Sequence, residues 1–237
     1  MDINLMVGTP MYGGKADCVY IETILHIKHW CMKNNVGLEF CFLTNQSSIS
    51  HARNDVAAEF LSSDCTHLLF LDADVGFNVD PSLKEMLDLD LDFVVGSYPK
   101  KRIDWDRVVE MAKAGMSPAD IERKASTQLI DPQTEHFDYS KVVQISHAPT
   151  GLMLLKREVF TKFRNHYGET GRAYSSWGKP RYNYFGTAVV PSRDTYLSED
   201  TYFCMHHTGA GGQIHFLPWV KAVHEGYYRY RSENINE

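Results

Sequence analysis

The sequence lacks the features typical of membrane proteins, secreted proteins and strongly basic nucleic-acid-binding proteins. No apolar run approaches the roughly 20 residues of a membrane span, and the start, MDINLMVGTP, has no basic region followed by an apolar one as a signal peptide has. The five cysteines are scattered and form no CxxC pair, which indicates reduced, mostly buried thiols. A formal net charge of −6 argues against binding nucleic acid chiefly through its phosphates, although a local basic groove is compatible with it. We therefore expect a cytoplasmic protein without stable membrane insertion.

Two common nucleotide-binding motifs are also missing. No GxGxxG follows the first predicted strand, which disfavours a dinucleotide-binding oxidoreductase. The glycine-rich stretch GGKAD lacks the GxxxxGK[ST] spacing of a P-loop. A nucleotide, if one binds, must therefore be held by a different arrangement.

What the sequence does contain is an alternation of predicted strands and helices over its first hundred residues. Its 237 residues, 43% hydrophobic, suffice for one sizeable core. Short apolar strands are expected within 3–14, 37–45, 66–74 and 91–99, and helices within 18–35, 49–63 and 81–90. Ser50 is the expected N-cap of the second helix. This order predicts an α/β fold with a mostly parallel, doubly wound central sheet, in which ligands bind at the carboxyl ends of the strands.

The second half of the chain has a different pattern. Residues 104–145 contain two short predicted helices, separated at Gly115 and restarted by Ser117 as a cap. We interpret this stretch as a small helical insertion on the sheet. A strand, a turn, a strand and a helix follow, then a helix that begins near Ser198 and a closing strand.

Two aspartates end the third predicted strand, in the stretch HLLFLDADVGF. Alternation along a strand would direct Asp72 and Asp74 to the same face. Two carboxylates there repel each other unless a cation or protons intervene, and hard divalent cations prefer oxygen ligands. A bare DxD is common, and residues 88–90 and 90–92 match it too. The position directly after a central strand therefore distinguishes Asp72 and Asp74.

Several motifs together resemble GT-A-fold glycosyltransferases, especially family 2-like enzymes and small viral and phage members. The motifs, in chain order, are VGTPMYGG, SISHARNDVAAEFL, LFLDADVGF, VVGSYPKK, APTGLMLLKREVF, SEDTYFCMHHTGAGG and AVHEG. The resemblance covers about residues 3–226 and implies a single catalytic domain over 1–237. Its expected parts are a nucleotide-sugar half (about 1–103), the helical insertion (about 104–140), an acceptor half (about 141–226) and a tail (227–237).

The resemblance implies a metal-dependent transfer of a sugar from a nucleotide-diphosphate sugar, with UDP as the default nucleotide, to a hydroxyl group. Asp74 is then the more direct metal ligand, Asp72 lies nearer the ribose or a metal-bound water, and His224 is the third ligand. Mn²⁺ is expected ahead of Mg²⁺ because histidine suits it better. The structural alternative for His224 is a hydrogen-bonded core histidine. If the protein is viral, its location is the host cytoplasm.

The resemblance also implies contacts to the nucleotide sugar. The expected residues are Thr9, Pro10, Met11, Arg53, Asn54, Asp72, Ala73, Lys100 and Gly151. An arginine could pair with the diphosphate. The alternative for Arg53 and Asn54 is the polar face of an amphipathic helix. Lys101 could reach the donor phosphates as Lys100 could, and a solvated turn is the alternative for both.

The acidic pair at the start of the late helix implies the catalytic base. Asp200 is the expected proton acceptor, with Glu199 second; the alternative is that both acids complement the helix dipole. A later loop with Trp177, Tyr182, Tyr184 and Phe185 is either an acceptor lid or a packed hydrophobic loop. Inverting and retaining outcomes both stay open.

Other functions remain as alternatives. A sugar-nucleotide nucleotidyltransferase would need a stronger glycine-rich signature near the amino terminus than GTPMYGGK. A non-catalytic nucleotide-sugar-binding module would keep Asp72 and Asp74 but would not need Asp200. The acceptor is open: a glycan is favoured, and a hydroxymethylated DNA base fits small phage-like members. The sequence indicates no oligomeric state.

Overall fold

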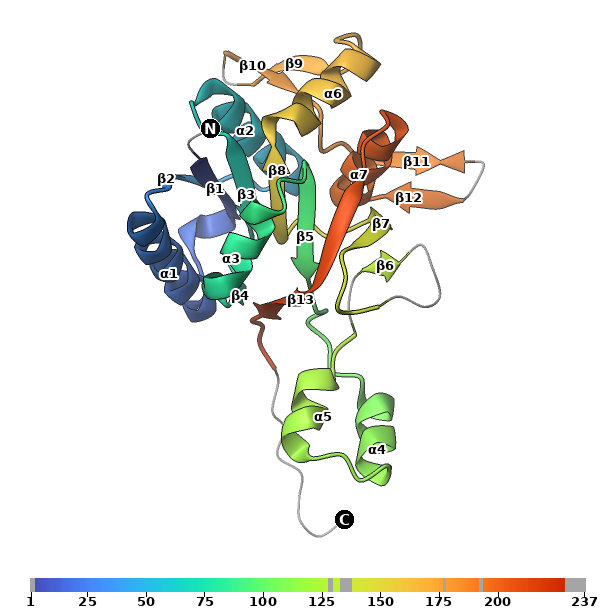
Figure 1. The fold of residues 1–237 in the computed structure, drawn as a ribbon. Coiled ribbons are helices and arrows are strands. Elements are labelled where there is room, and N and C mark those ends of the chain that lie inside the picture. The colour runs from blue at the N-terminus through green and yellow to red at the C-terminus, as the bar shows by residue number, and fades with distance from the viewer. Residues whose placement is uncertain (1–2, 128–129, 133–137, 177, 192–193, 229–237) are drawn as a thin grey trace.

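The fold is organised around one mixed central sheet (Figure 1), seen in a computed structural model that describes residues 3–127, 130–132, 138–176, 178–191 and 194–228. In spatial order the strands are β2 (Gly37–Thr44), β1 (Asn4–Met11), β3 (His67–Leu71), β8 (Leu152–Lys156), β5 (Phe93–Ser97), β13 (Ile214–His224), β7 (Val143–His147) and β6 (Asp131–Pro132), and β4 (Val75–Phe77) pairs with β13. The predicted strand and helix order of the first hundred residues is confirmed.

The direction of the strands agrees with the predicted, mostly parallel sheet. β1 pairs in parallel with β2 and β3, and β13 pairs in parallel with β5. β8 runs antiparallel between β3 and β5, and β7 runs antiparallel to β13. The carboxyl ends of β1, β3, β5 and β13 consequently lie at one edge of the sheet, where ligands bind in folds of this kind.

Helices cover both faces of the sheet, as a doubly wound fold requires. The helices are α1 (Cys18–Asn34) and α3 (Val79–Asp88) on one face, and α2 (Ile49–Ser62), α6 (Arg157–Tyr167) and α7 (Glu199–Gly209) on the other. Alternation along β1 divides the core: Leu5 and Val7 pack with α1 and α3, whereas Met6 packs with α2 and α6. Each face therefore has its own hydrophobic cluster.

The aromatic loop predicted as either a lid or a packed segment is a packed segment where the structure describes it. Tyr182, Tyr184 and Phe185 are buried, at 4%, 1% and 0% exposure. The ring of Phe185 stacks on Phe203 of α7 at 4.2 Å between centroids and meets Phe70 of β3 edge-on at 5.3 Å. These side chains hold the second half of the chain to the sheet, so the lid interpretation is wrong for them. Trp177 lies outside the described residues.

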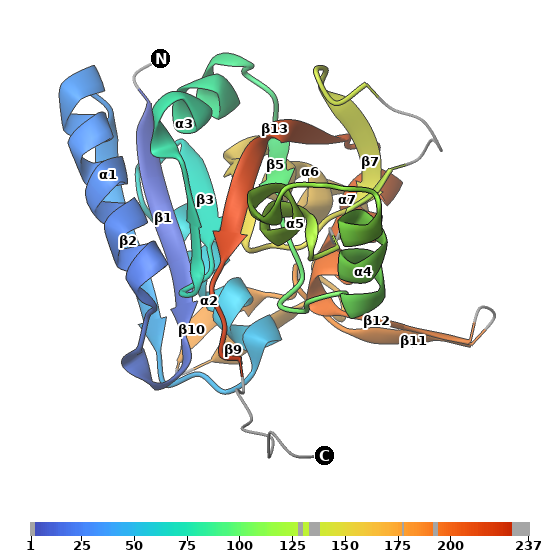
Figure 2. The same ribbon diagram turned by 90° about the horizontal axis from the view of Figure 1, so that it is seen from below.

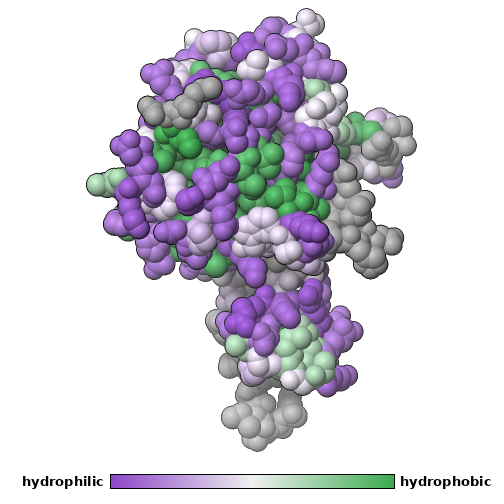
Figure 3. All heavy atoms as spheres, viewed as in Figure 1, coloured by the Kyte–Doolittle hydropathy of each residue, from purple (hydrophilic) through white to green (hydrophobic). Residues whose placement is uncertain are grey.

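The predicted helical insertion is a hairpin of α4 (Trp105–Lys113) and α5 (Pro118–Lys124) that projects from the edge where β5 ends (Figures 1 and 2). Gly115 has a φ of 75° between the helices, and the Ser117 hydroxyl caps α5 by accepting from the amide of Asp120. Hydrophilic side chains cover much of the hairpin (Figure 3). The chain then returns to the sheet through β6, which pairs with β7.

Smaller elements complete the described chain. They are the 3-10 turn η1 (Tyr12–Gly14) and two hairpins, β9 (Ala173–Ser176) with β10 (Lys179–Tyr182) and β11 (Ala188–Val190) with β12 (Thr195–Leu197). The predicted cap of α2 is displaced: Ser48, not Ser50, precedes the helix and accepts from the amide of His51. Among the helices of the described residues, none is long and apolar enough to span a membrane.

Candidate active site

The predicted aspartates lie in a tight turn between β3 and β4. β3 ends at Leu71, and the Val75 amide donates to the Asp72 carbonyl at 3.0 Å. The Asp72 amide donates to the carbonyl of Gly151 at 3.2 Å, which fixes the turn against the start of β8. Because both residues lie beyond the strand, strand alternation does not set their directions as we had expected. Instead, each carboxylate has its own basic partner.

Asp74 meets His224 and Lys101. Its Oδ1 lies 3.5 Å from His224 Nε2, and its Oδ2 accepts from the Lys101 ammonium. Burial alone would raise the pKa of the Asp74 carboxyl. The hydrogen bonds from His224 and Lys101 and the charge of Lys101 outweigh burial and lower that pKa to about 2. Asp74 is therefore a carboxylate at neutral pH.

The orientation of His224 is fixed by its second ring nitrogen. Nδ1 lies 2.9 Å from the carbonyl oxygen of Pro99, and since a carbonyl only accepts, Nδ1 carries a proton. On the side of Asp74, Nε2 donates to the carboxylate when it carries a proton and presents a lone pair when it does not. A histidine that donates one N–H to a backbone carbonyl and offers its other nitrogen is the usual arrangement of a metal ligand. The Tyr98 hydroxyl lies 3.3 Å from Nε2, slightly closer to it than Asp74 Oδ1 does.

Asp72 faces a buried arginine. Arg53 of α2 is 4% exposed, and its two terminal nitrogens donate to the Asp72 oxygens at 3.1 and 3.3 Å. Its Nε donates to Glu199 Oε1 of α7 at 3.3 Å. Arg53 was expected to contact the nucleotide sugar, at its diphosphate or at its base. In this structure its guanidinium instead joins the turn after β3 to the first residue of α7.

Asp200 lies at the amino terminus of α7 beside Glu199. Its Oδ1 accepts from the amide of Thr201 at 2.7 Å and from the hydroxyl of Ser198. The carboxylate is thus oriented by the amino terminus of its own helix. Catalysis and helix capping are compatible here, as the sequence had allowed.

A hollow of about 330 Å³ opens beside the two aspartates. Its lining residues are Pro10, Tyr12, Lys15, Ala16, Asp17, Ile49, Asp72, Ala73 and Asp74. Its size is within the range of small-ligand sites. Two residues beside it belong to the core: Thr9 is fully buried, with its hydroxyl 2.7 Å from that of Tyr20, and Met11 packs against the cluster under α1.

The other predicted contacts have structural partners. Asn54 is buried, donates to Asn183 Oδ1 at 3.1 Å and accepts from the amide of Phe185 at 2.8 Å. Gly151 is packed against Tyr98: a Cβ at this glycine would lie 2.2 Å from the Tyr98 ring. The amide of Lys100 donates to the carbonyl of Thr127 at 2.9 Å. This bond joins the two chain segments that connect the α4–α5 hairpin to the sheet, which we call the neck of the hairpin.

Among the described residues, no three histidine, cysteine or acidic side chains are grouped as a metal centre. Of the predicted ligands, Asp74 and His224 lie together, while Asp72 is paired with Arg53. The 3.5 Å between Asp74 Oδ1 and His224 Nε2 brings the two atoms close enough to contact one cation. One carboxylate oxygen and one oriented imidazole nitrogen fit Mn²⁺ better than Mg²⁺. The residues present therefore fit the predicted cation as a two-ligand set.

The two other DxD matches lie elsewhere. Asp90 and Asp92 precede β5 and so lie at the opposite end of the sheet, where Asp90 pairs with Lys156. Asp88 ends α3 and pairs with Lys84, four residues earlier. Of the three matches, Asp72 and Asp74 are the pair that directly follows a strand at the carboxyl edge of the sheet.

Sequence reasoning gave less attention to several residues around the aspartates. Tyr98, Asp17 and Glu225 were not predicted; the Asp17 amide donates to Ala73 and the Glu225 amide to Asp74, both at 2.8 Å. Lys101 was considered, but Lys100 was preferred. The sequence offered one signal for Tyr98 and Lys101, because both lie close to the end of the strand predicted within 91–99.

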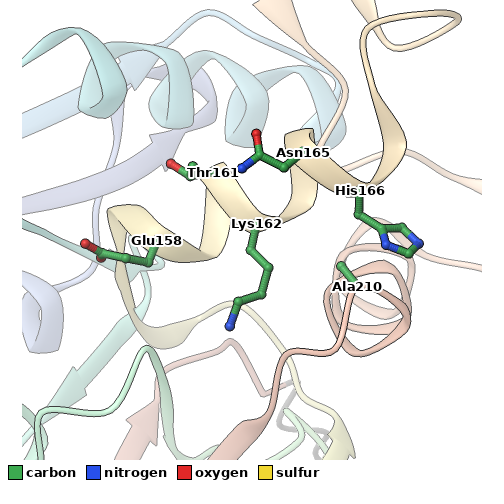
Figure 4. A pocket seen from close by; sticks show the side chains of 6 residues that line it. All are labelled: Glu158, Thr161, Lys162, Asn165, His166 and Ala210. Carbon is green, nitrogen blue, oxygen red and sulfur yellow. The ribbon is translucent and has the colours of Figure 1, made fainter.

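A second hollow on the surface, close to α6, is separate from these residues (Figure 4). It is lined by Glu158, Thr161, Lys162, Asn165, His166 and Ala210. None of them was predicted as a site residue, and none contacts Asp72, Asp74 or His224 in a recorded interaction.

A scan against protein-family models gives no match, and no curated protein matches the sequence. Among solved structures, A197 from STIV matches with a TM-score of 0.53 at 13% identity, over 95% of this chain and 87% of that one. The catalytic domain of Drosophila β1,4-galactosyltransferase 7, in complex with xylobiose, matches with a TM-score of 0.44 at 14% identity, over 92% of this chain and 66% of that one. GalNAc-T7 with UDP, GalNAc and Mn²⁺ also has a TM-score of 0.44, at 12% identity, over 94% and 44%.

The similarity to A197 is a similarity of fold and, together with the sheet topology, confirms the predicted α/β architecture. The two glycosyltransferases belong to the class of enzymes that the sequence resembles.

Proposed function

We propose that the protein is a metal-dependent glycosyltransferase that moves a sugar from a nucleotide-diphosphate sugar, with a UDP-sugar favoured, to a hydroxyl acceptor. One observation carries this proposal: Asp74 and an oriented His224 meet beside a hollow at the carboxyl edge of the sheet. This is the edge at which doubly wound folds bind nucleotides.

Asp74 and His224 would hold the cation, with Asp72 nearer the ribose or a metal-bound water. A bound Mn²⁺ or Mg²⁺ supplies positive charge beside the diphosphate as that group leaves. Pro10 and Tyr12 line the hollow and are the candidates to contact the nucleoside. Arg53 is buried between Asp72 and Glu199, and its role would be to hold both carboxylates in position.

Asp200 is the candidate base that takes the proton of the acceptor hydroxyl. Glu199 is the weaker candidate because its carboxylate already accepts a hydrogen bond from Arg53. Among the described residues, no arginine or lysine is hydrogen-bonded to Asp200. A hydroxyl of a glycan is the acceptor we favour, and a hydroxymethylated DNA base is the alternative to be screened.

The experiment is donor turnover by the purified protein. UDP-, GDP- and CDP-sugars are incubated with Mn²⁺ and with a panel of glycan and hydroxymethylated-DNA acceptors, and release of the nucleoside diphosphate is measured. We expect release with one nucleotide class. Asp200→Asn should abolish it while retaining nucleotide affinity, and Asp88→Asn, on the surface of α3, should leave it unchanged.

Other results would point to the alternatives. Nucleotide binding without turnover in the unmodified protein, across all acceptors, would favour a binding module. Formation of a sugar nucleotide and pyrophosphate from a nucleoside triphosphate and a sugar phosphate would favour a nucleotidyltransferase. Full turnover by Asp200→Asn would remove Asp200 as the base.

A further inference from the structure

Lys101 occupies a place at Asp74 that a cation would need. Its ammonium donates to Asp74 Oδ2, and the two side chains are 35% and 34% exposed. His224 lies at the other oxygen of the same carboxylate. The charge of Asp74 is therefore balanced by side chains of the protein itself.

The path of the Lys101 side chain is shaped by a glycine. A Cβ at Gly226 would lie 2.8 Å from Lys101 Cδ and 3.4 Å from its Cγ. The aliphatic part of Lys101 thus passes closely over the backbone that follows His224. A larger residue at 226 would obstruct this path.

Lys101 is also attached to the helical hairpin. It lies in the segment of the neck that leads from the sheet to α4. Two bonds join this segment to the returning one: the amide of Lys100 donates to the carbonyl of Thr127 at 2.9 Å, and that of Asp104 to the carbonyl of Ala125 at 2.8 Å. These bonds hold the backbone on either side of Lys101, and within the described residues the hydrogen bond of its side chain is the one from the ammonium to Asp74. The ammonium can therefore exchange partners without unfolding the neck.

We propose that Lys101 is a mobile counter-charge of the site: it neutralises Asp74 in the free protein and turns to the diphosphate of the donor when a divalent cation binds at Asp74. The inference rests on the proposed function. Two positive charges at one carboxylate repel each other, so a cation at Asp74 releases the ammonium. The leaving diphosphate is the nearest new negative charge that such a complex brings, and a lysine binds phosphate well as a point charge.

The test separates two affinities in Lys101→Met. Mn²⁺ binding is measured alone by electron paramagnetic resonance, and UDP binding at saturating Mn²⁺ by calorimetry. Loss of the competing ammonium should increase the affinity for Mn²⁺ by about two- to fivefold, which corresponds to the energy of a partly exposed ion pair. Loss of the phosphate contact should lower the affinity for UDP by about tenfold.

Two further variants sharpen the result. Gly226→Ala should also increase the affinity for Mn²⁺, as Lys101→Met does, because the added methyl group displaces the aliphatic part of Lys101. Arg102→Met removes a neighbouring charge of the neck and should change neither affinity. A structural ion pair alone would not produce opposite changes in the two affinities.

A failure of the Lys101 proposal can be distinguished from a failure of the proposed function. If the unmodified protein binds Mn²⁺ and UDP but Lys101→Met changes neither affinity, or weakens Mn²⁺, the role of Lys101 is refuted and the proposed function stands. If the unmodified protein binds no Mn²⁺, both ideas are overturned.

Discussion

Replacing Arg53 should be the most destabilising single charge change at the site. Arg53→Met removes a guanidinium that is 4% exposed and leaves the carboxylates of Asp72 and Glu199, 23% and 15% exposed, without the positive charge that pairs with both. Breaking a buried pair by removing one partner costs about 3–5 kcal/mol. Because both carboxylates keep some contact with water, we expect the lower end, about 3 kcal/mol.

The assay is urea unfolding followed by circular dichroism, with Arg123→Met as a matched control. Arg123 also pairs with an aspartate, Asp120, but is 69% exposed, so its loss should cost less than about 1 kcal/mol. Adding Glu199→Gln to Arg53→Met should recover part of the lost stability, because it removes one of the unpaired charges. A cost for Arg53→Met no greater than that of the control would refute the reasoning.

Two more predictions concern packing and pH. Gly151→Ala should lower the free energy of unfolding by about 1–3 kcal/mol and displace Tyr98, because its methyl group would lie 2.2 Å from that ring; unchanged stability in urea unfolding would contradict this packing. His207 is fully buried, and burial, opposed by its bond to the carbonyl of Gln213, lowers its pKa to about 4 from 6.5. The unfolded chain therefore binds the extra proton below pH 6.5, and stability should fall between pH 6.5 and about 4 by up to about 3 kcal/mol. His207→Phe should flatten this part of the pH profile of unfolding, and an unchanged slope would show that another group is responsible.

The sequence predicted the sheet and its helices because apolar periodicity is a local signal. It also located the turn with Asp72 and Asp74, since a carboxylate pair directly after an apolar strand differs from one inside a helix end. The pairing of β8 between β3 and β5 was not predictable in this way. It depends on long-range contacts that leave no periodic signal in a single sequence.

The partners of the site residues were the hardest to predict. Arg53 was placed correctly on the second helix, but its burial between Asp72 and Glu199 joins residues 146 positions apart. The aromatic residues around 184 allowed both a lid and a core, because composition does not show which face of a loop meets the sheet. Their burial against Phe70 and Phe203 decided it.

The most direct test of the central claim is calorimetric titration with UDP, GDP and CDP, with and without Mn²⁺. Asp74→Asn is measured beside the unmodified protein, and Asp88→Asn serves as the control. We predict that one nucleotide binds only when Mn²⁺ is present, that Asp74→Asn loses this binding and that Asp88→Asn keeps it. Nucleotide binding that is independent of Mn²⁺, or that survives in Asp74→Asn, would contradict a metal-dependent site at Asp74 and His224.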